Sequence, residues 1–439
     1  SYRSGSCPLI LLTDGSGTDG SGKAVLLTAD HTWYTLVDSG TSDPPPSFDY
    51  PGFLQFPAID RGEFLPHVCL GGHPWSEGTT TPAYRSPLPY LRTGPGTALD
   101  GKPKFDLTKF NPEYFDRMRQ RVMEAGNAGI CIAIQLFQGF SVADKGYPPG
   151  ASQSPWRGHP YNVSNNVNGI NGDPDGDGAG YEAVTLQDSA ITSLQEAYVR
   201  KVIDTVNDLD NVLYEIVNES NGCMDSVAWQ NHLIDYIHAY EEGKGKRHPV
   251  GFTTPWPCGE MNDLQASNAG WISPNGDLGY ETDPPEATGQ KVIVADTDHI
   301  VYPRGDREWV WKSVVRGLNV AFMDPYDCAA EWSPAGCTFT DATYASLRVN
   351  LGYAQSYARR MNLRAMTPQS SLSSTGYLLA SPDVAESEYL VYAPSVGSFT
   401  VNLTKSAGAF AVEWLNPETG SVSDGDSVQG GQVQTFTAP

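Results

Sequence analysis

Short apolar segments alternate with longer amphipathic segments over most of this chain. Continuous apolar runs, Ile130 to Phe137 and Val212 to Val217, predict buried strands. Amphipathic stretches from about Asn111 to Gly126 and from about Leu186 to Asp208 predict helices. Seven clear strands and a doubtful one at Trp271 to Ser273 alternate with helices in this way. The pattern therefore predicts an α/β fold, a (β/α)8 TIM barrel.

The remaining elements of the barrel are expected in the same alternation. They are strands at Ala24 to Thr28, Val250 to Thr254, Val292 to Ala295 and Val320 to Met323, and helices at Ser226 to Glu242, Trp309 to Arg316 and Tyr344 to Met361. After Pro368 the pattern changes to short strands of alternating polarity, which is typical of a small β-sandwich. We therefore expect a barrel over residues 1–365, opened by an N-terminal hairpin or turn, and a C-terminal β-sandwich over residues 366–439.

The composition narrows the classes of partner. The 439 residues include 51 acidic and 28 basic side chains, a formal net charge of −23. Nucleic-acid binding relies on Lys and Arg that neutralise phosphates, so this balance argues against it. No apolar run approaches the ~20 residues of a membrane span. The chain starts at Ser1 without a signal peptide, so we expect that an export signal has been removed or was never present.

Polar and aromatic residues gather where the predicted strands end. In a parallel barrel the carboxyl ends of the strands meet at one face, where reactive groups lie. The residues expected there are His31, Trp33, Gln135, Gln138, Asn218, Glu219, Trp256, Asp296, Asp298, His299, Asp324 and Tyr326. This mixture suits a sugar, because one carboxylic acid can protonate the departing oxygen while a second carboxylate attacks the anomeric carbon or activates water. Aromatic faces would stack on sugar rings, and amides would bind hydroxyls.

Stretches along nearly the whole chain are similar to a known family. Asn218-Glu219 at the end of the fourth strand, with an acid ending the seventh, resembles the clan of retaining (β/α)8 glycoside hydrolases. Residues 290–296, QKVIVAD, are similar to that clan's seventh strand. More closely, LLTADHTW, NVLYEIVNES and WVWKSVVRGLNVAFMDPY resemble bacterial glycoside hydrolases of the apiosidase type with a DUF4038 domain, which often carry a C-terminal sandwich labelled collagen-binding.

The resemblance implies a role for each acid. Glu219 would be the general acid/base, and Asn218 would bind the hydroxyl beside the scissile bond. Asp296 falls where the clan has its nucleophile, but the clan uses Glu there. The shorter Asp requires a closer backbone or a different carboxylate, for which Asp298 is the candidate, because two residues further along an extended strand it would point the same way as Asp296. The ordinary structural alternatives are helix caps and surface ion pairs for these acids, and packing for His31 and Trp33.

We therefore expect a glycoside hydrolase that cleaves O-glycosidic bonds of a plant or microbial poly- or oligosaccharide by a retaining double displacement. Glu219 would be the acid/base and Asp296, or Asp298, the nucleophile. Carbohydrate is the expected partner, and no cofactor is required. The alternative is a carbohydrate-binding protein on a hydrolase scaffold, with weak or no catalysis.

A second motif, Asp-Pro-Asp-Gly-Asp-Gly at 173–178, matches the first half of an EF-hand-type calcium loop. Asp173, Asp175 and Asp177 would supply oxygen ligands at alternate positions. The twelfth position is Val184 instead of the bidentate Glu of such loops. Two interpretations stay open, a structural Ca²⁺ site and a solvated acidic turn.

Seven cysteines leave at least one unpaired. Cys223 and Cys258 follow neighbouring predicted strands, and Cys328 and Cys337 are close in sequence, so each pair is a candidate disulfide. Disulfides suit an exported protein, and we expect a secreted or periplasmic location.

Residues 57–73 interrupt the pattern. The second strand expected there contains Pro66 and lacks clean periodicity, whereas the resembling family has an apolar strand ending in Trp-Glu. A reading frame shifted by one nucleotide can encode LQSTGVNFFRMYAWE in place of residues 57–71, which restores that strand and replaces Cys69 by Ala. We hypothesise a compensated frameshift, which would remove a substrate-contacting Glu and weaken catalysis.

Overall fold

The structure is a computed structural model. It describes residues 10–11, 17–18, 24–32, 35–40, 42–61, 67–69, 84–143, 154–300, 305–323 and 342–439. The predicted site residues Trp33, Asp324 and Tyr326 and the candidate pair Cys328 and Cys337 lie outside the described residues. None of the described helices is both long and apolar enough to cross a membrane.

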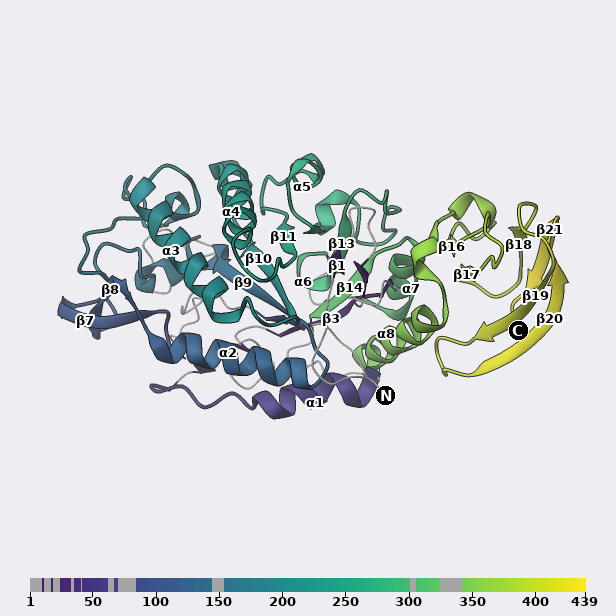
Figure 1. Ribbon diagram of the computed structural model, residues 1–439, viewed down its shortest axis with the longest axis horizontal. Coiled ribbons are helices and arrows are strands. Elements are labelled where there is room, and N and C mark those ends of the chain that lie inside the picture. The colour runs from purple at the N-terminus through teal and green to yellow at the C-terminus, as the bar shows by residue number, and fades with distance from the viewer. Residues whose placement is uncertain are drawn as a thin grey trace.

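Parallel strands form one curled sheet with helices packed on its outer side (Figure 1). Each strand is hydrogen-bonded to the next in the order β9 (Ile132–Gln138), β10 (Val212–Asn218), β11 (Val250–Thr253), β12 (Trp271–Ser273), β13 (Val292–Asp296), β14 (Asn319–Met323), β3 (Thr28–Thr32) and β5 (His67–Cys69). The helices are α1 (Tyr50–Arg61), α2 (Pro112–Asn127), α3 (Ser189–Val206), α4 (Ser226–Glu241), α5 (Met261–Ala266), α6 (Thr297–Ile300), α7 (Arg307–Val315) and α8 (Ala342–Arg360). This arrangement confirms a TIM-like α/β fold, with the doubtful strand present as β12.

The hydrophobic core has two layers because side chains alternate between the faces of a strand. Ile134 of β9 belongs to the large outer cluster, which also contains Tyr198 of α3 and Trp229 of α4. Ala133 of β9 and Leu213 of β10 belong to a second cluster, which lies on the inner side of the curled sheet. All seven residues of β9 and of β10 are buried, which explains why both strands are continuous apolar runs.

The first barrel strand begins later than predicted, although β3 does extend to His31, where the strand end was expected. Its pairing with β14 covers Thr28 to His31 instead of Ala24 to Thr28. Leu27, although apolar, has its N–H bound to the side-chain Oδ1 of Asn319 at 2.8 Å, so the strand ladder begins after it. The shift places the backbone of His31 within β3.

Several elements were not predicted. Helix α1 follows the Pro-rich residues 43–47, and a long hairpin of β7 (Tyr90–Thr97) and β8 (Pro103–Phe110) precedes α2. Arg92 of β7 forms a two-contact ion pair, at 2.5 and 3.2 Å, with Asp100 in the turn of this hairpin. Polar side chains dominate the outer face of the hairpin and hid its strands from the apolar pattern.

The interrupted segment 57–73 contributes the last turns of α1 and the short strand β5. β5 pairs in parallel with both β3 and β9, so three residues occupy the position of the expected second strand despite the poor pattern. The rest of the segment lies outside the described residues. The frameshift hypothesis stays a prediction that the nucleotide sequence tests.

The C-terminal region consists of small antiparallel sheets. They pair β15 (Thr367–Pro368), β16 (Leu378–Ala380) and β17 (Tyr389–Val391), then β18 (Ser398–Asn402) with β21 (Val433–Thr437), and β19 (Ala409–Leu415) with β20 (Val422–Gln429). Figure 1 shows them beside α7 and α8. Arg360 of α8 bonds Glu413 of β19 at 2.7 Å, and Asn350 Nδ2 donates to the carbonyl of Pro417 at 2.9 Å. These sheets fit the expected β-sandwich.

Candidate active site

Three polar side chains meet at the carboxyl ends of the strands. Asn218 is the last residue of β10, and its Nδ2 donates to Oε1 of Gln138, the last residue of β9, at 3.0 Å. Its Oδ1 accepts from Nε2 of His299, in α6 directly after β13, at 2.7 Å. An amide oxygen only accepts, so Nε2 of His299 carries the proton in this contact. The hydrogen bonds fix the orientation of the Asn218 amide from both sides.

Glu219 follows Asn218 in a backbone conformation that is unusual for its type. Its φ is 48°, in the left-handed region, and its side chain is half-buried. A non-glycine residue there costs about 1–3 kcal/mol, and such residues cluster at functional sites. This left-handed conformation turns the chain out of β10, so Glu219 lies at the end of the strand, next to Asn218.

Gly139 allows this turn to approach β9. A Cβ at Gly139 would lie 2.6 Å from the carbonyl oxygen of Asn218 and 2.6 Å from the backbone nitrogen of Ser220. Only glycine permits such a contact between the two backbones. The sequence shows a Gly directly after Gln138. Its role could not be predicted, because it depends on the backbone of the neighbouring strand.

The two aspartates after β13 have different environments. Asp296 ends the strand, is 5% exposed, and accepts the backbone N–H of Asp298 at 3.0 Å through Oδ1. Asp298 lies in α6, and its Oδ2 is 3.7 Å from Nε2 of His299. The expectation that Asp298 continues an extended strand and points the same way as Asp296 is therefore wrong, because the chain turns into a helix after Asp296. In the sequence, Asp296 and Asp298 are three residues and one residue before His299.

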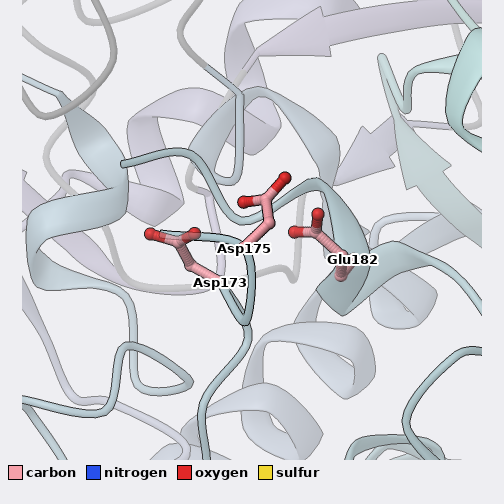
Figure 2. Close-up of side chains that lie close together, drawn as sticks. All are labelled: Asp173, Asp175 and Glu182. Carbon is pink, nitrogen blue, oxygen red and sulfur yellow. The ribbon is translucent and has the colours of Figure 1, made fainter. Parts of the chain in front are cut away.

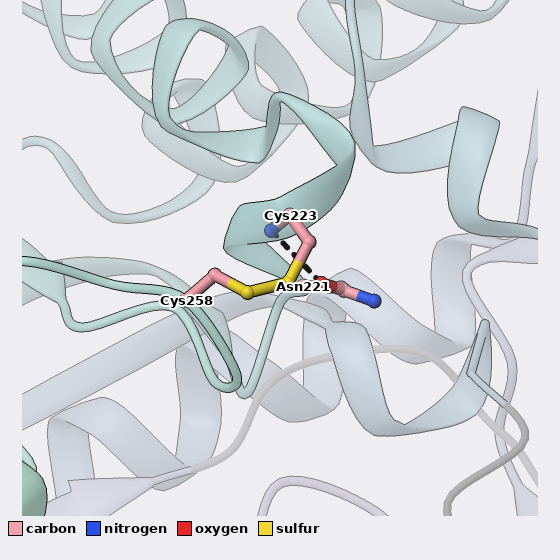
Figure 3. The surroundings of a disulfide bond; sticks show 3 residues. All are labelled: Asn221, Cys223 and Cys258. Atoms are coloured by element: carbon pink, nitrogen blue, oxygen red, sulfur yellow. Dashed lines mark hydrogen bonds between the residues drawn. A yellow bond between two sulfur atoms is a disulfide. The ribbon is translucent and has the colours of Figure 1, made fainter.

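The loop after β11 lies against the Glu219 turn. Trp256, 48% exposed, donates its backbone N–H to the carbonyl of Ser220 at 2.7 Å. Two residues on, Cys258 forms a disulfide with Cys223, as the sequence predicts, with Cα atoms 5.2 Å apart. Figure 3 shows this bond and Asn221, whose Oδ1 accepts from the N–H of Cys223 at 2.9 Å. The backbone of the segment that carries the exposed Trp256 is thus held against the residues that follow Glu219.

A polar pair lies deeper, inside the sheet. Gln135 of β9 and Glu215 of β10 are register partners, two residues beyond the inward-facing Ala133 and Leu213, so both point inward. Gln135 is fully buried, and neither its Oε1 nor its Nε2 has a hydrogen-bond partner within the described ranges. Glu215 accepts from the Thr253 hydroxyl. Sequence reasoning missed Glu215, although its alternation with Leu213 on a buried strand marked it.

The acidic motif in the loop after β9 forms a separate cluster. Ligand-capable oxygens of Asp173, Asp175 and Glu182 all lie within 4.8 Å of one another (Figure 2). Asp177, expected in this group, is exposed and instead accepts the N–H of Ala179 at 2.7 Å. Burial first, and then the surrounding carboxylates, raise the pKa of Glu182 above its usual range. Burial likewise raises the pKa of Asp173.

Two family models match parts of the chain. The first, "Domain of unknown function (DUF6298)", matches residues 76–258, and the second, "Putative collagen-binding domain of a collagenase", matches residues 370–439. The first model names a different domain of unknown function from the one that the sequence resemblance suggests. No curated protein matches the chain.

Solved structures similar to this one are glycoside hydrolases. One described only as a glycoside hydrolase has a TM-score of 0.59 at 12% identity, over 98% of this chain and 93% of that one. A glycoside hydrolase family 5 structure from Bacteroides vulgatus has a TM-score of 0.58 at 12% identity, over 99% of this chain and 92% of that one. The chain therefore shares the fold of glycoside hydrolase family 5 structures and ends in a segment that matches a collagen-binding domain model.

Proposed function

We propose that this chain is a retaining glycoside hydrolase that acts on a plant or microbial poly- or oligosaccharide. The observation that carries the proposal is the hydrogen-bonded set Gln138–Asn218–His299 at the strand ends. Glu219 follows Asn218 directly, Asp298 directly precedes His299, and Asp296 lies three residues before His299. The likeness in fold to glycoside hydrolases supports a sugar as the ligand of this arrangement.

In the proposed reaction two carboxyl groups divide the work. Glu219 protonates the departing glycosidic oxygen while Asp296 attacks the anomeric carbon and forms a glycosyl–enzyme ester. Glu219 then takes a proton from water, which releases the sugar and frees Asp296. Asp298 is the alternative nucleophile, and its position beside His299 distinguishes it from Asp296.

Asn218 has the capacity to bind substrate while it holds the network. Its amide has two N–H donors, and Gln138 accepts one of them. We assign the second to a sugar hydroxyl beside the scissile bond. The rest of the proposed substrate-binding set is His31, Trp33, Gln135, Trp256, His299, Asp324 and Tyr326.

The proposal extends to the architecture and location of the protein. A complete (β/α)8 barrel over residues 1–365 is supported by the pairing of β5 with both β3 and β9, and a β-sandwich over residues 366–439 by the antiparallel sheets. We propose a secreted or periplasmic polysaccharide-degrading enzyme that needs no cofactor. The Cys223–Cys258 disulfide supports an oxidising compartment.

The test is hydrolysis of a panel of polysaccharides and aryl glycosides, with the products identified. We expect the wild-type protein to release sugar from one class and Glu219→Gln to release almost none. Glu242→Gln is the matched control, because Glu242 is exposed at the C-terminal end of α4, the end opposite the strand ends that carry Glu219. Glycan binding by the wild type without hydrolysis would instead support the carbohydrate-binding alternative.

A further inference from the structure

We infer that the loop after β9 holds a Ca²⁺ site whose protein ligands are the carboxylates of Asp173, Asp175 and Glu182. This site is separate from the proposed catalytic residues and does not rest on them. Figure 2 shows the three side chains at one turn, with Glu182 reaching across from a neighbouring segment. Glu182 comes from η3 (Tyr181–Val184), whereas both aspartates come from the turn itself.

The spacing of the oxygens suits one cation. The three carboxylate oxygens lie within 4.8 Å of one another. Two oxygens bound to one Ca²⁺ at 2.3–2.6 Å are at most about 5 Å apart, so the group can close on this ion with small side-chain adjustments. The set contains oxygen ligands alone, which a hard cation prefers. Asp175 is exposed, so water can complete the coordination shell.

The burial of Glu182 is a second reason to expect a cation, separate from the spacing of the oxygens. The residue is only 7% exposed, and its Oε2 is buried with no hydrogen-bond partner in the part of the chain that the structure describes. A buried carboxylate oxygen without a donor or counter-charge carries a large desolvation cost. The carboxylates of Asp173 and Asp175 lie close to Glu182, and their like charge raises that cost further. A divalent cation removes both penalties at once.

The turn itself prepares Asp173 for this role. Its Oδ1 accepts the N–H of Gly176 at 2.8 Å, and its Oδ2 accepts the N–H of Gly178 at 3.1 Å. These bonds fix the carboxylate and leave a lone pair on each oxygen for a metal. No basic side chain among the described residues pairs with Asp173, Asp175 or Glu182, so nothing described competes with a cation there.

The other partner segment is also fixed. Gly180 precedes η3 and lies so close to Trp156 that a Cβ would be 2.3 Å from the indole ring. Its N–H donates to the carbonyl of Val142 at 2.7 Å, just after the η1 turn (Gly139–Ser141) that follows Gln138. Gln195 of α3 donates to the carbonyl of Ala183 at 2.6 Å. Calcium would therefore tie the Asp-rich turn to a segment that is anchored beside the strand ends.

The site also explains the missing twelfth ligand. An EF-hand loop takes its bidentate Glu from position twelve, which is Val184 here. Counted from Asp173, Glu182 is the tenth residue, and the η3 turn brings it to the cluster. The EF-hand pattern was incomplete because the third acid comes from the η3 turn, at position ten, instead of from position twelve.

The experiment measures calcium binding by the full chain after EGTA treatment, by isothermal titration calorimetry and by thermal unfolding in CaCl₂, MgCl₂ or EGTA. We expect binding heat and a rise in unfolding temperature with CaCl₂, and a smaller rise with MgCl₂. Glu182→Gln should weaken calcium binding by about 10-fold or more. In EGTA this variant should unfold at the same temperature as the wild type or higher, because it removes an uncompensated buried charge.

Asp177→Asn is the matched control, since Asp177 lies on the same turn but outside the cluster and Asn can keep the bond to Ala179. We expect it to keep most of the calcium affinity. The inference is overturned if the wild type shows neither heat nor a shift in unfolding temperature with calcium. It is also overturned if Asp177→Asn abolishes binding while Glu182→Gln retains it. Neither outcome bears on hydrolysis, so failure here is distinct from failure of the proposed function.

Discussion

Two polar clusters on the same side of the curled sheet have opposite balances of donors and acceptors. At the strand ends, Asn218 donates to Gln138 and accepts from His299, so donor and acceptor are matched. In the acidic cluster, Asp173, Asp175 and Glu182 are all acceptors, and Oε2 of Glu182 has no donor among the residues that the structure describes. A matched cluster is organised for a neutral polar ligand such as a sugar, whereas an acceptor-only cluster requires a cation.

The largest expected effect separates the two clusters by function. Glu219→Gln should lower kcat/KM on the best substrate by about 10²–10⁴-fold, because general acid–base catalysis typically contributes this much. It should leave calcium affinity unchanged, whereas Glu182→Gln should do the reverse. Kinetics and calorimetry on both variants test the comparison. Loss of calcium binding in Glu219→Gln would show that the clusters are one site.

A smaller effect tests the network at the strand ends. Asn218→Ala removes a donor aimed at the proposed sugar hydroxyl and should lower kcat/KM by about 10²-fold. His299→Ala removes the bond that holds Oδ1 of Asn218 and should cost less. Because the two residues act as a unit, the double variant should be hardly worse than Asn218→Ala alone. Additive losses would show that His299 acts independently of Asn218.

The smallest effect concerns backbone strain at Glu219. Glycine adopts the left-handed region without the steric cost that other residues bear there, so Glu219→Gly should be about 1 kcal/mol more stable to unfolding than Glu219→Gln. Both variants should lack activity. Urea denaturation of the two proteins measures the difference. Equal or lower stability of the glycine variant would mean that the φ of 48° carries no net strain.

The sequence predicted most of the barrel because its strands are apolar runs. β9 and β10 are buried on both faces, so every residue contributed to the signal. β7 and β8 alternate buried and exposed residues irregularly and went unnoticed. The ladder of β3 begins four residues later than predicted because a side chain, Asn319, takes the place of a backbone partner at Leu27. A side chain that replaces a backbone hydrogen-bond partner cannot be recognised until the neighbouring strand is known.

The sequence predicted a set of residues at the strand ends, but it carried no information on their geometry. The position of strand ends placed Asn218 and His299 on one face, and the structure joins them by a hydrogen bond. The sequence could not show that Asp296 caps α6, that Asp298 has left the strand, or that Gly139 permits the Glu219 turn. Glu182 was missed because it is the tenth residue counted from Asp173, whereas an EF-hand loop has its acidic ligand at the twelfth.

A retaining double displacement by Glu219 and a carboxylate after β13 determines the configuration of the released sugar. The most direct measurement is proton NMR of the anomeric configuration of the first sugar released by the wild-type protein, followed before mutarotation. The product should keep the configuration of the substrate, as expected for carboxyl groups about 5–5.5 Å apart. A product of inverted configuration would contradict this mechanism and would assign the second carboxylate to the activation of water.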